Sequence, residues 1–119
     1  MRNETFMTLK GDNYMAMQVE FSFDDQKMVK KGVRKEDIYY TLKKNFTERG
    51  LECTADGKIL TFAGTGKNED YGNIWAIIFA LIECDWFTDT ASSCVFVEND
   101  KEEDILSQIP KAKHIMATA

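Results

Sequence analysis

The clearest pattern in the chain is an alternation of apolar and polar residues over residues 14–23. The apolar positions are Met15, Met17, Val19, Phe21 and Phe23. A period of two predicts a strand whose apolar face meets a core and whose other face meets water or a partner. Residues 1–13 are either an N-terminal leader or an extra strand, and the pattern leaves both alternatives open.

A helix is predicted over residues 35–49, because Ile38, Leu42 and Phe46 recur every four positions and share one face. Its first turn is acidic, which favours the helix dipole. Gly50 suits the left-handed position that follows a last helical turn, so the sequence marks both ends of this helix.

Residues 51–55 and 58–63 predict a β-hairpin. The Asp-Gly pair at positions 56 and 57 tolerates the positive φ angles of a two-residue turn. With such a turn Cys53 lies opposite Leu60, and the large apolar residues of the two strands share one face.

A second helix is predicted from residue 68 or 70 to about residue 86, and it is apolar nearly all round. Such a helix is expected either at the centre of a domain or as half of an oligomer interface. A short strand over residues 94–97 follows, and then an amphipathic helix over residues 102–109 that stops at Pro110. The final residues, 111–119, are expected to form a frayed tail.

In chain order the predicted elements are βαββαβ followed by a short C-terminal helix. This order resembles the ferredoxin-like split βαβ arrangement, a four-stranded antiparallel sheet of order 4-1-3-2 with two helices on one face. We therefore expect a single α+β domain over residues 14–110. Unrelated functions share this topology, so the expected fold does not predict an activity.

Charge is distributed unevenly along the chain. The net charge is −5 over 119 residues, but residues 1–50 hold ten Lys/Arg against eight Asp/Glu, and residues 51–119 hold five against twelve. An acidic surface repels a polyanion, so general nucleic-acid binding is not expected.

The cysteines and the apolar runs indicate the cellular compartment of the protein. Cys53, Cys84 and Cys94 are an odd number in no metal-binding spacing, which favours free thiols in a reducing, cytoplasmic compartment. The longest apolar run, residues 74–82, is far shorter than the roughly twenty residues that cross a bilayer. Neither a membrane segment nor a signal peptide is predicted.

No residue pattern predicts catalysis, a metal or a cofactor. The single histidine, His114, lies near the C-terminus, away from any cysteine or serine that it could activate. Residues 61–68 resemble a phosphate-binding loop, but they have Thr61 where that loop needs glycine and Asn68 where it needs Ser or Thr. A flexible connection is the preferred interpretation.

Three groups of residues are candidates for contacts with other molecules. The candidate basic patch contains Lys27, Lys30, Lys31, Arg34 and Lys35. The candidate pocket contains Tyr71, Trp75, Trp86 and Phe87, although most aromatic clusters belong to a core. The candidate interface contains Ile59, Val95 and Val97, which a sheet covered on one side leaves on its other face.

The preferred functional hypothesis is a non-catalytic protein-interaction or regulatory accessory domain that self-associates, with a homodimer expected. The basic patch and the acidic residues 98–104 offer complementary charges for such contacts. One alternative is a small-molecule sensor with a pocket between sheet and helices. Another is a cofactor-free enzyme, which would need a titratable group with a perturbed pKa in a closed cavity.

Overall fold

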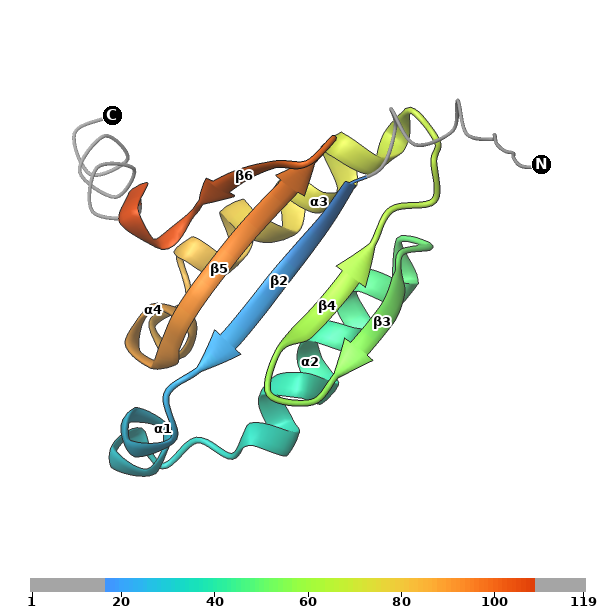
Figure 1. Ribbon diagram of the computed structural model, residues 1–119. Helices are drawn as coiled ribbons and strands as arrows, with labels where there is room; N and C mark the ends of the chain where they lie inside the picture. Colours follow the sequence, from blue (N-terminus) through green and yellow to red (C-terminus); the bar gives the residue numbers. More distant parts are fainter. Residues whose placement is uncertain (1–16, 109–119) are drawn as a thin grey trace.

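The computed structural model describes residues 17–108. Its central strand is β2 (Met17–Phe23). Five antiparallel strands form one sheet in the order β3-β4-β2-β5-β6 (Figure 1). The other four strands are β3 (Glu52–Asp56), β4 (Leu60–Ala63), β5 (Ala91–Glu98) and β6 (Lys101–Asp104). The expectations for residues 1–13 and 111–119 lie outside the described residues.

The predictions of an α+β fold and of an antiparallel sheet are confirmed, but the predicted number of four strands is wrong. Residues 101–104, expected to be partly helical, pair with β5 as a fifth strand, so the strand order also differs from the four-stranded order. Asn99 and Asp100 turn the chain with φ angles of 52° and 69°, which suits a two-residue hairpin turn. The only helical residues described after β6 are Leu106–Gln108, a short 3-10 turn.

Residues 17–108 form four α-helices, where two helices and a short C-terminal helix were expected. They are α1 (Asp25–Lys31), α2 (Lys35–Glu48), α3 (Glu69–Ile82) and α4 (Asp85–Thr90). Figure 1 shows α2 and α3 behind the sheet, where they cover one face, and α1 and α4 beside each other near the end of β2. No described helix covers the other face of the sheet.

Helix α1 is absent from the sequence-based prediction, although its caps are recognisable. The Asp24 carboxylate accepts a hydrogen bond from the Lys27 N–H at 3.0 Å, which caps the first turn. Gly32, with φ of 69°, ends the helix in the left-handed region that glycine adopts without strain. The polar composition of this segment concealed a short helix that buries only Met28.

The single apolar helix expected up to residue 86 is broken into α3 and α4. Cys84 has φ of −97° and ψ of 119°, an extended conformation that ends one helix and starts the next. The turn directs Phe87 into the core, where it is 1% exposed and lies 5.9 Å from the ring of Phe21. Burial of this aromatic side chain favours the break over a continuous helix.

The predicted register of the β3–β4 hairpin is wrong. Cys53 pairs with Phe62, and a β-bulge after Cys53 shifts the following pairs, so that Asp56 pairs with Leu60. The loop therefore spans residues 57–59 and has three residues in place of the expected two. It is held to α2 by Tyr39, whose hydroxyl donates to the Gly57 carbonyl at 2.7 Å.

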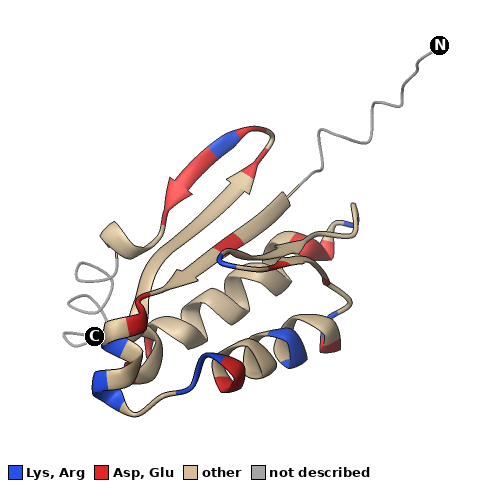
Figure 2. Ribbon diagram, turned by 60° about the horizontal axis from the view of Figure 1, so that its bottom comes forward, with Lys and Arg blue, Asp and Glu red and all other residues tan. Residues whose placement is uncertain are grey.

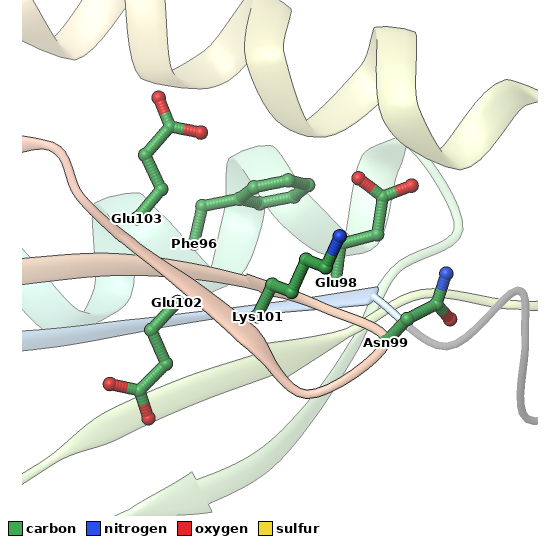
Figure 3. A pocket seen from close by; sticks show the side chains of 6 residues that line it. All are labelled: Phe96, Glu98, Asn99, Lys101, Glu102 and Glu103. Carbon is green, nitrogen blue, oxygen red and sulfur yellow. The ribbon is translucent and has the colours of Figure 1, made fainter.

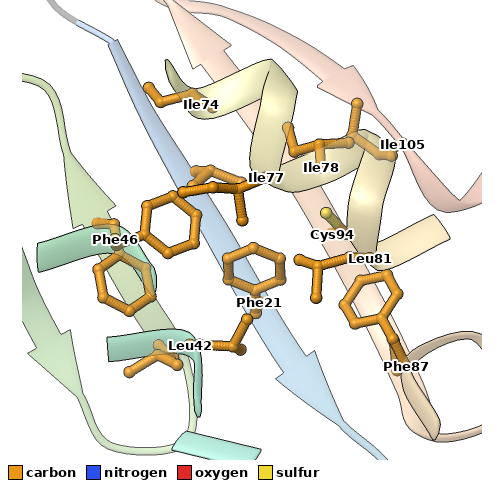
Figure 4. Close-up of a cluster of buried hydrophobic side chains, with 14 of the residues drawn as sticks. Phe21, Leu42, Phe46, Ile74, Ile77, Ile78, Leu81, Phe87, Cys94 and Ile105 are labelled. Carbon is orange, nitrogen blue, oxygen red and sulfur yellow. The ribbon is translucent and has the colours of Figure 1, made fainter. Parts of the chain in front are cut away.

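The core fills the space between the sheet and the helices (Figure 4). Phe21 of β2 is fully buried and meets the edges of the Phe46 and Phe62 rings at 5.9 and 6.3 Å. Those two rings stack on each other with centroids 4.1 Å apart. Phe21 thus connects both helical crossovers to the central strand.

Replacement of Phe21 with alanine is expected to lower the free energy of unfolding by about 3–5 kcal/mol, because it leaves a cavity at this junction. Denaturant unfolding followed by circular dichroism at one protein concentration measures the loss. Val29→Ala is the control, since Val29 is 81% exposed and its loss should change stability by no more than about 0.5 kcal/mol. Equal effects of the two substitutions would contradict the central position of Phe21.

Candidate interaction surfaces

Between exposed Glu69 and Glu83 at its two ends, the outer face of α3 has no charged residue although it is open to solvent. Residues 71–82 contain no Asp, Glu, Lys or Arg. The isoleucines and leucine on one side of the helix pack on the sheet, whereas Tyr71 and Phe79 on the other side are 50% and 55% exposed. Apolar surface of this kind usually marks a contact site in a soluble domain.

Two parallel rows of side chains make up this face, which we call the α3 surface. One row is aromatic and the other is small, each with a spacing of four residues: Tyr71, Trp75 and Phe79; Gly72, Ala76 and Ala80. The Trp75 ring lies 6.1 Å from Tyr71 and 5.5 Å from Phe79, and the Phe96 ring of β5 supports it at 5.3 Å. The aromatic row is therefore an exposed ridge that is fixed in position by the contact between Trp75 and Phe96.

The Trp75 indole is incompletely satisfied. Its Nε1–H is shielded from solvent and meets no hydrogen-bond acceptor among residues 17–108. Such a donor costs about 1–3 kcal/mol relative to one that is paired.

The loop that resembles a phosphate-binding loop holds a carboxylate of the chain itself. Asp70, at the start of α3, accepts hydrogen bonds of 2.7 Å from the Thr65 hydroxyl and from the Gly66 N–H. The carboxylate is 2% exposed, and a Cβ at Gly64 would lie 2.6 Å from its Oδ2 atom. The loop amides thus serve to order the entry into α3, and the nearby negative charge opposes a bound phosphate.

The open face of the sheet has an apolar strip with polar neighbours on both sides. Val95 of β5 pairs with Glu20 on one side and Asp104 on the other, and Val97 pairs with Gln18 and Glu102. The Gln18 side-chain amide donates to the Glu20 carboxylate at 2.8 Å. We call these six residues the β5 strip.

A groove of about 470 Å³ lies beside the β5–β6 hairpin. Figure 3 shows Phe96, Glu98 and Glu103 directed toward α3, whereas Glu102 points to the opposite side of the sheet. The groove is lined by Phe96, Glu98, Asn99, Lys101, Glu102 and Glu103. Its rim is acidic, and Glu102 contributes to the open face.

The candidate basic patch is spread over α1 and the start of α2, on a part of the molecule where Figure 2 shows several basic residues. Lys31 lies 3.4 Å from Asp89, and Arg34 lies 3.8 Å from Glu36. The ammonium group of Lys35 lies 5.2 Å from the centre of the Tyr39 ring. Internal partners therefore engage three of the five predicted cations, and all of these contacts are on the surface.

The four residues of the candidate pocket occupy two separate places. Tyr71 and Trp75 belong to the α3 surface, whereas Trp86 and Phe87 lie on α4. Phe87 is part of the core, and Trp86 borders a small hollow of about 170 Å³ beside α2. Sequence reasoning missed Phe79, whose signal was its spacing of four residues from Trp75.

The residues of the candidate interface are also divided. Val95 and Val97 are partly exposed in the β5 strip, but Ile59 is 50% exposed in the β3–β4 loop, and β2 lies between β4 and β5. Sequence reasoning missed the carboxylates around the valines, because only the sheet register shows that Glu20 and Asp104 flank Val95.

The pKa shifts found among residues 17–108 have structural causes. Burial, with a smaller contribution from Asp104, raises the pKa of the Cys94 thiol to about 12, so this thiol is not a ready nucleophile. The hydrogen bond from Lys43 holds the pKa of the exposed Asp56 below its usual value. Within residues 17–108 no group of three His, Cys, Asp or Glu side chains is placed to hold a metal ion, and His114 lies outside this range.

No protein-family model, curated protein or solved structure matches the chain. Among the described helices, none combines the length and the apolar character needed to cross a membrane.

Replacement of Asp70 with asparagine is expected to lower the free energy of unfolding by about 1–3 kcal/mol at pH 7, because it weakens charge-assisted hydrogen bonds. Burial raises the pKa of Asp70, but hydrogen bonds from Thr65, Gly66 and Lys67 outweigh burial and leave the pKa below its usual value. The carboxylate therefore stabilises the fold above the unfolded pKa of about 3.9, and this contribution is lost as the pH falls through the folded pKa.

Urea unfolding of both proteins between pH 7 and pH 3 tests this expectation, and the difference in stability should shrink at the acidic end. Asp100→Asn, in the exposed β5–β6 turn, is the matched control and should show no such difference. A constant difference between wild type and Asp70→Asn over the whole pH range would contradict the role of the ionised carboxylate.

Proposed function

We propose that the protein is a non-catalytic interaction domain that self-associates as a homodimer through the α3 surface. The observation that carries the proposal is the exposed, uncharged face with Tyr71, Trp75 and Phe79 in one row. Aromatic residues are enriched at the centres of protein interfaces, and charged residues are depleted there. Between residues 71 and 82, burial of this face covers no charged side chain of the helix itself.

The shape of the α3 surface supports a second copy of the chain as the partner. A two-fold interface requires a surface that is complementary to itself. The aromatic ridge and the adjacent row of Gly72, Ala76 and Ala80 meet this requirement. In an antiparallel two-fold crossing the small residues of the two copies lie against each other, and the aromatic side chains of the two ridges interdigitate.

The sheet edges give less support for association. β6 has four charged residues in a row, and β3 begins and ends with Glu52 and Asp56. Charged edge strands discourage pairing with another sheet. The α3 surface is therefore the preferred site of contact between copies.

The size of the surface sets the expected strength of the dimer. A helix of 14 residues is about 21 Å long, and one crossing of two such helices buries less than the roughly 800 Å² per partner of a standard interface. We expect an association in the micromolar range.

We also propose a ferredoxin-like relationship for the fold and a cytoplasmic location. Support for the fold comes from β2, which lies between β4 and β5 while β3 lies outside β4, with β6 as an addition at the far edge. Support for the location comes from the three free cysteines, which suit a reducing compartment.

Multi-angle light scattering over a range of protein concentrations tests the proposed function. The wild-type mass should rise toward that of a dimer, and Phe79→Glu should increase the dissociation constant at least about tenfold, because it places a charge in the apolar contact. Tyr40→Glu is the matched control, since Tyr40 is an aromatic residue of α2 with 68% exposure.

The Tyr40→Glu protein should associate as the wild type does. A wild-type protein that stays monomeric at all concentrations would refute the proposal. A dimer that Phe79→Glu leaves intact would assign the contact to another surface.

A further inference from the structure

The charges of the open sheet face are of one sign. No described strand residue on this face is Lys or Arg. Its carboxylates belong to three strands and are Glu20, Glu52, Glu102 and Asp104. The basic residues of α1 and α2 lie on the helical side or at the end of the sheet. A partner that covers this face must therefore bring positive charge.

The spacing of the β5 strip limits the shape of that partner. Strands are about 4.8 Å apart, so the polar rows on β2 and β6 are separated by roughly 10 Å across β5. This distance is close to the diameter of an α-helix with its side chains. When a helix lies over Val95 and Val97, one of its sides is above the polar residues of β2 and the other is above those of β6.

We propose that the β5 strip binds a basic amphipathic helix of a partner protein. The apolar stripe of that helix contacts Val95 and Val97, and Lys or Arg side chains on its flanks pair with Glu20, Glu102 and Asp104. A helix on the open face completes a three-layer arrangement of helices, sheet and helix, which buries the second face of the sheet. This site is separate from the α3 surface, because the two lie on opposite sides of the sheet.

The carboxylates decide between classes of partner. A nucleic acid or an anionic membrane would meet like charge at Glu20, Glu102 and Asp104. The contact is expected to weaken with salt, because the charges lie at the surface and are screened over about 10 Å at 0.1 M ionic strength.

Fluorescence anisotropy with a labelled peptide tests the proposal. The probe is a peptide of about 18 residues with leucines at helical i, i+3 and i+4 spacing and lysines on both flanks, and the comparison is a scrambled peptide of the same composition. The wild-type protein should bind the amphipathic peptide at least about tenfold more tightly than the scrambled one. Measurements in the Phe79→Glu background keep the result independent of the proposed dimer.

Two double variants with the same change in net charge provide the control. Glu20→Lys with Glu102→Lys should weaken binding at least about tenfold, whereas Glu36→Lys with Glu48→Lys, on α2, should weaken it by no more than about threefold. Equal losses in both variants, equal binding of both peptides, or no binding at low salt would each overturn the proposal. Long assemblies of the chain alone that Glu20→Lys with Glu102→Lys dissolves would assign the strip to a second copy and also overturn it.

Discussion

The contacts of Phe21 in the middle of β2 are the interaction on which the two-layer structure depends. Its ring meets Phe46 from α2, Phe62 from β4 and Phe87 from α4, so one residue joins the parts that follow β2 in the chain. Because strand residues alternate between faces, burial of Phe21 and Val19 places Glu20 on the opposite face. The same alternation that builds the core thus leaves a polar, open face.

Helix α3 has more apolar surface than the core requires. Ile74, Ile78 and Leu81 face the sheet and account for its attachment. Phe79 contacts the ring of Trp75 on the same helix but remains 55% exposed, and this exposed apolar surface supports the proposed association. Self-association through α3 on one side and a helical partner on the other would make the protein a small adaptor with two independent faces.

Local sequence patterns correctly predicted the helix and strand whose apolar periodicity is visible without knowledge of their tertiary contacts. The alternation that predicted a strand is confirmed over residues 17–23, and the four-residue spacing that predicted α2 is confirmed over residues 35–48. Residues 101–104 escaped prediction because four charged residues disfavour a strand, and only pairing with β5 makes them one. The hairpin register failed because a bulge after Cys53 depends on tertiary contacts.

The candidate surfaces were only partly predictable for the same reason. The apolar character of residues 74–82 was visible in the sequence, and it predicted either a central helix or an interface. Which side of α3 is exposed depends on how the helix sits on the sheet. The neighbours of Val95 come from residues 75 positions earlier and nine positions later in the chain, so only the register of the sheet identifies them.

Disulfide cross-linking at Ala76 tests self-association through α3 most directly. In an antiparallel two-fold crossing centred on the α3 surface, Ala76 lies next to its symmetry mate, within reach of a disulfide. Ala76→Cys, in a background with Cys53→Ser and Cys84→Ser, should form a covalent dimer on mild oxidation, whereas Tyr40→Cys in the same background should not. Absence of the Ala76 cross-link at concentrations where light scattering shows a dimer would contradict the account.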